Sequence, residues 1–380
     1  MVTIERGGSP RPIDKFITND ENGLNWVKIG DAPEQGNYIT QTAEKIRPEG
    51  LSKTREVHPG DLILSNSMSF GRPYIMAIDG CIHDGWLAIR DTKKNFDLKF
   101  LCTLLGTDGM LNQYKAMAAG STVNNLNKEL VGGTTVTFPM VEEQIKIGDY
   151  FTTLDHLITL HQRKCEQTKK LKKYMLQKMF PQNGAKVPEI RFYGFTYDWE
   201  QRKVTDLGEI YIGLVTTMTE HYTDKGHLLI RNSDIKDGYF EFGENPIYLD
   251  EEFSERNKLR MHQLGDVITV HTGDIGTSAV IGENEVNSIG FATIVTRPNQ
   301  EILDSNYFAT YLNTDTHKQW AVSMATGDGR SNYNLKDYTK LVVPIPEIEE
   351  QKKIAACIVN LNSLITLHQR QHKLHLDMLL

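Results

Sequence analysis

The feature that most constrains this chain is a long, uninterrupted helical pattern at residues 141–180. The stretch has no glycine after Gly148 and no proline before Pro181, so nothing inside it is expected to break a helix. Its apolar residues recur at alternating spacings of four and three, which is the pattern of a coiled-coil seam. At about 1.5 Å per residue, one such helix would span roughly 60 Å, longer than the core of a single domain requires.

The same helix occurs a second time near the end of the chain. Residues 142–144 (EEQ) recur at 349–351, and residues 157–163 (LITLHQR) recur identically at 364–370, both 207 positions later. Each copy offers the other an apolar stripe, so an antiparallel pair with pseudo-twofold symmetry is expected. The predicted helix-pair interface consists of Ile147, Phe151, Leu154, Ile158, Ile354, Ile358, Leu361 and Ile365.

The segments between the helices repeat as well. The glycine-aspartate-hydrophobic pattern at residues 60–64 matches residues 265–269, and residues 117–120 match residues 324–327. Between these anchors the copies diverge, so one scaffold is expected to carry two different surfaces. We predict a duplicated α/β (α+β) fold with these parts: a first domain at 1–140, a first long helix at 141–183, a second domain at 184–346 and a second long helix at 347–380.

Within the first domain the pattern predicts short strands and a helical segment. One or two helices are expected at residues 97–119, with a break at Gly106. The short strands are expected at residues 62–64, 74–78, 86–89 and 134–138.

Composition limits the class of protein. No apolar run is long enough to span a membrane, no signal peptide is visible, and the four cysteines are scattered, as in a reduced cytoplasmic protein. The net charge of −7 argues against a free-standing nucleic-acid binder. Residues 163–178 are strongly basic, however, with Glu166 as their single acidic residue. This basic strip is either a solvated helix face or a surface that faces phosphates or a partner.

Motifs for chemistry are missing from the sequence. It contains no phosphate-binding P-loop, no cofactor-binding glycine loop with the Asn/Asp-Pro-Pro-aromatic motif of adenine methyltransferases, and no convincing nuclease cluster. We therefore interpret the chain as non-catalytic and expect no cofactor on it. Histidines and a cysteine share helix faces at residues 161–165 and 368–375. One interpretation is a zinc site between the helices, and the favoured one is a polar seam that fixes the helix register. No metal is therefore predicted.

Polar loops at matched positions of the two domains are the candidate binding residues. Arginine, asparagine, serine, threonine and histidine are the residue types that read base edges and hold phosphates. In the first domain the candidates are Arg6, Ser9, Arg11, Asn66, Ser67, Arg72, Ser121 and Asn124. In the second they are Thr217, His221, Tyr222, Arg231, His271, Thr272, Thr277, Arg330, Asn332 and Tyr333.

As a set, these features resemble the specificity subunits of type I restriction-modification enzymes. The resemblance is carried by residues 188–192 (PEIRF) with Trp199, residues 207–209 (LGE), the opening at residues 7–10 (GGSP), both glycine-aspartate strands and both EEQ helices. It implies two target-recognition domains, each reading one half of a split double-stranded DNA site, with the long helices setting the spacer.

The resemblance also implies partners. Two modification subunits would methylate adenine with S-adenosylmethionine, and motor subunits would use ATP and magnesium to restrict unmodified DNA. Two other readings remain open from the residues: the recognition part of a methyltransferase-nuclease fusion, and a coiled-coil spacer protein unrelated to DNA. The missing catalytic motifs disfavour the first, and the duplicated domains disfavour the second.

Overall fold

A computed structural model describes residues 1–34, 36–66, 70–118, 126–182, 184–325 and 332–379. Over these residues the chain divides into two compact units, residues 1–163 with 370–380, and residues 164–369. The two long helices that the sequence predicts are confirmed as α4 (Val141–Lys178) and α9 (Ile348–Asp377), and each contributes to both units. Among the described residues, no helix combines the length and apolar character that crossing a lipid bilayer requires.

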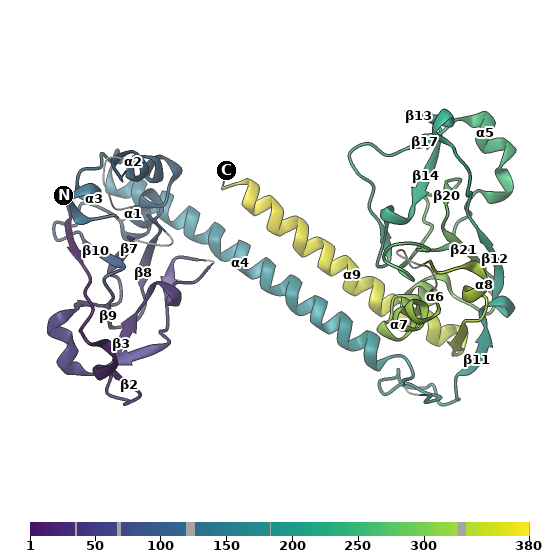
Figure 1. The fold of residues 1–380 in the computed structure, drawn as a ribbon, viewed down its shortest axis with the longest axis horizontal. Helices are drawn as coiled ribbons and strands as arrows, with labels where there is room; N and C mark the ends of the chain where they lie inside the picture. Colours follow the sequence, from purple (N-terminus) through teal and green to yellow (C-terminus); the bar gives the residue numbers. More distant parts are fainter. Residues whose placement is uncertain (35, 67–69, 119–125, 183, 326–331, 380) are drawn as a thin grey trace. The chain divides into compact units, whose positions relative to one another are not determined.

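The first unit is built from helices and two sheets (Figure 1). One sheet has the order β1 (Thr3–Arg6), β10 (Trp86–Arg90), β7 (Leu62–Ser65), β8 (Pro73–Met76), β4 (Tyr38–Ile39). The other has the order β2 (Ile17–Thr18), β5 (Glu44–Ile46), β3 (Leu24–Val27), β9 (Gly80–Ile82), β6 (Arg55–Val57). Besides its parts of α4 and α9, this unit has the α-helices α1 (Leu98–Leu105), α2 (Asp108–Ala118) and α3 (Lys128–Gly132).

The central strands of the first sheet, β10, β7 and β8, are buried on both faces. Along β10, Leu87 and Ile89 pack with residues of α1 and α2, whereas Trp86 and Ala88 pack with Val27 and other residues of the second sheet. This alternation explains why these strands are continuously apolar in the sequence. The strands expected at residues 62–64, 74–78 and 86–89, and two helices interrupted at Gly106, are thereby confirmed.

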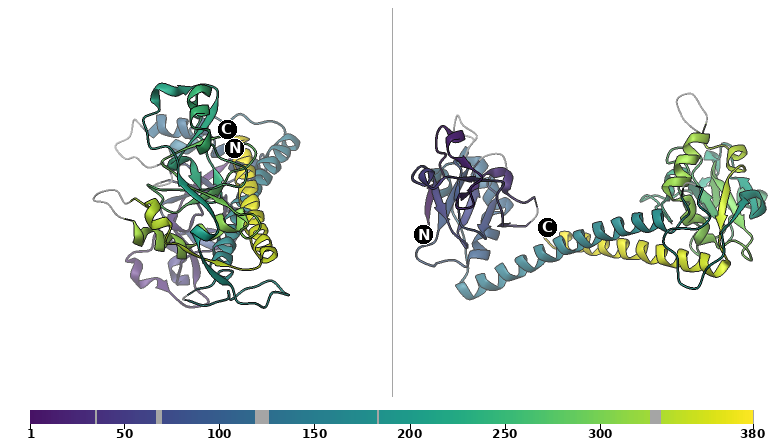
Figure 2. Two further views of the ribbon diagram at one scale, coloured as in Figure 1. Left: turned by 90° about the vertical axis from the view of Figure 1, so that its right-hand side faces the viewer. Right: turned by 90° about the horizontal axis from the view of Figure 1, so that it is seen from below.

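The second unit repeats this plan (Figures 1 and 2). Its main sheet has the order β12 (Gly208–Ile212), β21 (Ile294–Pro298), β18 (Val267–Thr269), β19 (Ser278–Val280). A second sheet has the order β13 (Tyr222–Thr223), β17 (Tyr248–Leu249), β14 (His227–Arg231), β20 (Ile289–Phe291). Two small pairs are β11 (Glu200–Lys203) with β22 (Val342–Ile345), and β15 (Ile235–Lys236) with β16 (Tyr239–Phe240). Its further helices are α5 (Glu251–Arg256), α6 (Ser305–Leu312), α7 (Asp315–Met324) and α8 (Leu335–Tyr338).

The glutamine of each EEQ motif ties a long helix to its domain. Gln144 and Gln351 are fully buried. The side-chain oxygen of Gln144 accepts from the backbone N–H of Asp97 at 3.0 Å, and that of Gln351 accepts from Asp304 at 2.9 Å. Both aspartates cap the helix that follows them, α1 or α6. The repeated motif is therefore explained by a repeated junction.

The prediction of a strand at residues 134–138 is wrong. The structure describes all of these residues, and they form no strand. Their counterparts in the second copy form β22, which pairs with β11. Among the described residues, no strand of the first unit pairs with residues 134–138 as β11 pairs with β22. The local pattern was correct, but a strand also needs a hydrogen-bonding neighbour.

Half of the predicted interface residues of the long helices are buried, and the other half are partly exposed. In the first unit Leu154 and Ile158 are buried, and in the second unit Ile354 and Ile358 are buried. Intermediate exposure is found for Ile147, Phe151, Leu361 and Ile365. Ile354 belongs to the core cluster that contains Met179 and Phe180, at the end of α4. Direct pairing of the first four residues with the last four remains a prediction.

The glycines that precede β7 and β18 allow a specific stability prediction. Gly60 and Gly265 have φ values of +93° and +87°, where a side chain is strained. We expect Gly60→Ala to lower the free energy of unfolding by about 1 kcal/mol. Gly265→Ala should cost more, because its added Cβ would lie 3.2 Å from polar atoms of Gln300 and Ser305. Urea denaturation measures both, and Gly30→Ala, with open space around it, is the control.

Candidate nucleic-acid interface

In the first unit, three segments distant in sequence meet at one edge of the main sheet. The backbone N–H of Gly7, just after β1, donates to the carbonyl of Trp86 at 2.9 Å. The N–H of Asn66, just after β7, donates to the carbonyl of Gly85 at 2.9 Å. A side chain at position 7 would not fit, because its Cβ would lie 2.2 Å from the carbonyl oxygen of His83. The ends of β1 and β7 and the turn before β10 therefore form one surface.

Asp84 lies at the centre of this surface. Its carboxylate oxygen Oδ1 accepts from Ser9 Oγ at 3.1 Å and lies 2.9 Å from His83 Nε2. Its other oxygen, Oδ2, lies 3.9 Å from Arg11 Nη2. Sequence reasoning selected Ser9 and Arg11 but missed His83 and Asp84. The available signal was a short polar turn, His-Asp-Gly, between two apolar strands.

The backbone of this turn is also held by predicted residues. The carbonyl of Asp84 accepts from Arg6 Nε at 3.3 Å and from Asn66 Nδ2 at 2.9 Å. Asn66 is only 2 % exposed, so its amide supports the turn from beneath. Arg72 does not join this group. Its guanidinium donates to the carbonyl of Glu34 at 2.8 Å and lies over the ring of Tyr74.

The second unit forms the equivalent edge with other side chains. The N–H of Gly213, just after β12, donates to the carbonyl of Thr293 at 2.8 Å, as Gly7 does to Trp86. Asn232 joins the loops: its Oδ1 accepts from the N–H of His271 at 2.7 Å, and its Nδ2 donates to the carbonyl of Ala292 at 3.2 Å. The end of β12, the turn after β14, the loop after β18 and the turn before β21 therefore meet.

Two further predicted residues, Thr272 and Asn332, complete this edge. Thr272 Oγ1 donates to Asn332 Oδ1 at 2.7 Å, and His271 Nδ1 lies 2.7 Å from the carbonyl of Tyr333. Tyr333 itself is fully buried, so its ring belongs to the core. Thr277 is also buried, and its hydroxyl donates to Asp274 at 2.6 Å. The edge is thus formed by His271, Thr272, Asn232 and Asn332.

Other predicted residues lie apart from this edge or are already paired. His221 Nδ1 lies 2.8 Å from Asp250, and its ring stacks on Phe253; the pKa of Asp250 is lowered by the N–H of Phe253 and by His221. Arg231 forms a two-pronged ion pair with Asp234, which raises the arginine pKa. Thr217 and Tyr222 are exposed. Ser67, Ser121, Asn124 and Arg330 lie outside the described residues.

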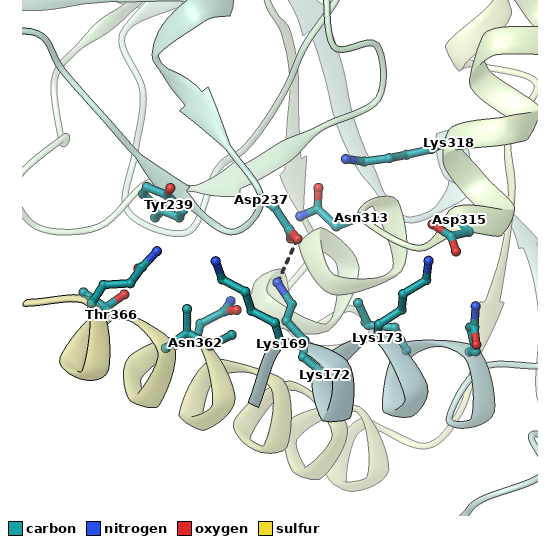
Figure 3. Close-up of a pocket in the computed structure, with 14 residues that line it drawn as sticks. Lys169, Lys172, Lys173, Asp237, Tyr239, Asn313, Asp315, Lys318, Asn362 and Thr366 are labelled. Carbon is teal, nitrogen blue, oxygen red and sulfur yellow. Dashed lines mark hydrogen bonds and ion pairs between the residues drawn. The ribbon is translucent and has the colours of Figure 1, made fainter. Parts of the chain in front are cut away.

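The basic strip of α4 lines a hollow of about 470 Å³ in the second unit (Figure 3). Lys172 is 9 % exposed and pairs with Asp237 at 2.8 Å. Lys169 and Lys173 project into the hollow from the same helix, and Lys318 reaches it from α7. Over the described part of the chain, Lys169 and Lys173 have no carboxylate within 4.0 Å. Part of the strip is thus structural, and part is open to an anionic group.

The histidines of the long helices do not gather into a metal site. The rings of His161 and His375 lie 5.4 Å apart, centroid to centroid. Across the residues that the structure describes, His, Cys, Asp and Glu side chains nowhere form a group of three suited to a metal ion.

Known proteins match both repeats. A family model described as "Type I restriction modification DNA specificity domain" matches residues 3–170 and 197–376. The EcoBI type I restriction enzyme specificity subunit of Escherichia coli is 22 % identical, covering 89 % of this chain and 73 % of that protein. The putative MjaX specificity subunit of Methanocaldococcus jannaschii is 23 % identical, covering 95 % of this chain and 82 % of that protein.

A solved structure has the same fold. The S subunit of a type I restriction-modification system from M. genitalium superposes with a TM-score of 0.59 at 14 % identity, covering 100 % of this chain and 94 % of that one. With most of both repeats matched by the family model, the chain belongs to the type I restriction-modification DNA specificity family and is a specificity subunit.

Proposed function

We propose that the two units read two unlike halves of one split double-stranded DNA site. The observation that carries this proposal is the pair of loop edges at equivalent places in the repeated scaffold. One edge presents Ser9, Arg11, His83 and Asp84, and the other presents His271, Thr272 and Asn332. Because direct readout depends on the donors and acceptors that a surface offers, unlike side chains select unlike bases.

Mapping of methylated adenines in DNA from cells that express the chain with its modification partner tests this proposal. The expected site has two different halves around a spacer of fixed length. A continuous site, or two identical halves, would contradict it.

The long helices are proposed to dock two modification subunits, which would supply adenine methylation, with motor subunits joining for restriction. Exposed apolar side chains on these helices favour such a role, because apolar side chains form the buried core of protein–protein interfaces. On α9 these side chains are Val359, Leu364, Leu367 and Leu374, and on α4 they are Ile145, Tyr150, Leu171 and Tyr174.

Partners are also expected to supply much of the phosphate neutralisation. The chain carries a net charge of −7, and many of its basic side chains are already paired with carboxylates. The isolated chain should therefore bind DNA weakly, with a shallow salt slope, while the assembled complex shows a steep salt slope. Fluorescence anisotropy at several salt concentrations measures both slopes. Equal affinity and equal slope for the chain and the complex would refute the expectation.

A further inference from the structure

The turn that leads into the last strand of the main sheet differs in chemistry between the two units. In the first unit, between β9 and β10, it carries His83, Asp84 and Gly85. In the second unit, between β20 and β21, it carries Ala292 directly after Phe291. The turn of the first unit lies against the residues just after β1, and the turn of the second unit lies against the residues just after β12. The two turns therefore occupy one structural position and differ in what they present.

Asp84 presents a hydrogen-bond acceptor. Its side chain is 33 % exposed, and its Oδ1 is used by Ser9 and His83. Its Oδ2 has Arg11, at 3.9 Å, as its nearest partner among the described contacts. The neighbouring guanidinium of Arg11 offsets the repulsion that a carboxylate would otherwise meet near DNA phosphates. An ionised carboxylate only accepts hydrogen bonds, so it selects a base that presents a donor.

In the major groove, cytosine and adenine both present an amino donor, but in different surroundings. The adenine amino group lies beside the N7 acceptor, which repels a carboxylate, whereas the cytosine amino group lies beside a C–H group. The chemistry of Asp84 therefore fits cytosine.

Phe291 presents an apolar surface. It is 40 % exposed, and its backbone is fixed because the N–H of Ala292 donates to the carbonyl of Leu214 at 2.9 Å. Ala292 has a φ of +49°, in the left-handed region that is strained for alanine. An exposed aromatic side chain on a backbone that is held in place matches the methyl group of thymine, which is the apolar feature of the major groove.

Resting on the function proposed above, we propose that Asp84 selects cytosine in the half-site of the first unit and that Phe291 selects thymine in the half-site of the second. Neither residue was singled out by the sequence. Asp84 and Phe291 lie at their edges because the order of the strands places them there.

The test uses the full chain expressed with its modification subunits, and the probe is genomic DNA whose methylated adenines are mapped. Asp84→Asn keeps the shape of the side chain but adds a donor. We expect it to lower the preference for cytosine about 10-fold at one position of one half, with the other half unchanged. Phe291→Ala should lower the preference for thymine at one position of the opposite half. Asp79→Asn is the matched control, because Asp79 is an exposed carboxylate paired with His58 at the other end of β9.

The outcomes separate this inference from the function on which it rests. An unchanged site in either variant, or a change in both halves, overturns the assignment while the split site remains. A wild-type site that is not split overturns the proposed function instead. Phe291 is exposed, so its truncation leaves the fold intact and keeps the test decisive even if Asp84→Asn fails to assemble.

Discussion

Exchange of residues 1–140 for the same segment of a relative is expected to change one half of the methylated site and leave the other half intact. Each loop edge is built within its own unit, from strands of its own sheets. The first edge depends on Gly7, Asn66 and Asp84, all of which lie inside the exchanged segment. No contact described for the second edge involves a residue before 141. The base sequence of one half-site should therefore become that of the relative which donates residues 1–140.

The junction at Met140 is suited to this exchange. α4 begins at Val141, and Gln144 holds the backbone of Asp97 and the carbonyl of Pro139. A donor segment that keeps the aspartate cap and the proline can remake these bonds. Methylation mapping of the exchanged chain measures the result, and the reciprocal exchange of residues 184–346 is its control. A simultaneous change in both halves would rule out two independent readers.

Loss of Arg191 is expected to destabilise the second unit by roughly 3–5 kcal/mol, because it leaves a buried carboxylate without its partner. Glu350, in the second EEQ motif, is 0 % exposed. Arg191 Nε and Nη2 donate to its two carboxylate oxygens at 2.7 and 2.9 Å. This ion pair fastens residues 187–192 to the start of α9. Urea denaturation of Arg191→Ala, with a probe in the second unit, measures the loss.

The internal repeat supplies the control for this prediction. Glu143 occupies the same motif position in the first copy, yet it is exposed. Glu143→Ala should therefore change stability by less than about 0.5 kcal/mol. The loss of unfolding free energy in Glu350→Gln should lie between those of Arg191→Ala and Glu143→Ala, since an amide keeps one hydrogen-bond acceptor but removes the charge. If Arg191→Ala and Glu143→Ala proved equally mild, the buried ion pair would not hold the second unit together.

The sequence by itself determined the features that repeat or that follow from local patterning. The offset of 207 between Gln144 and Gln351 revealed the duplication, and the absence of glycine and proline revealed the long helices. The strands β7, β8 and β10 were visible because both of their faces are buried, which makes them continuous apolar runs. Helix α1 was visible from its apolar spacing and from the break at Gly106.

The tertiary structure decided what depends on distant partners. Residues 134–138 have a strand-like pattern, but no strand of the described chain pairs with them, and they form none. Arg72 and Asn66 have the chemistry of DNA-binding residues, yet one is held by loop carbonyls and the other is buried beneath a turn. The second sheets went unnoticed because their strands are as short as Ile17–Thr18 and carry little periodicity.

The candidate binding edges show the same division. Sequence reasoning found Ser9, Arg11, His271 and Thr272 because polar loop residues are conspicuous between apolar strands. It missed Asp84 and Phe291, which we propose to select bases, because only their position in the fold points to them. The order of the strands brings the turns before β10 and β21 against the ends of β1 and β12. Hydrogen bonds between residues far apart in the sequence, such as Gly7 with Trp86 and Gly213 with Thr293, hold them there. A side chain becomes part of a site when such long-range pairing places it, and no local pattern encodes that placement.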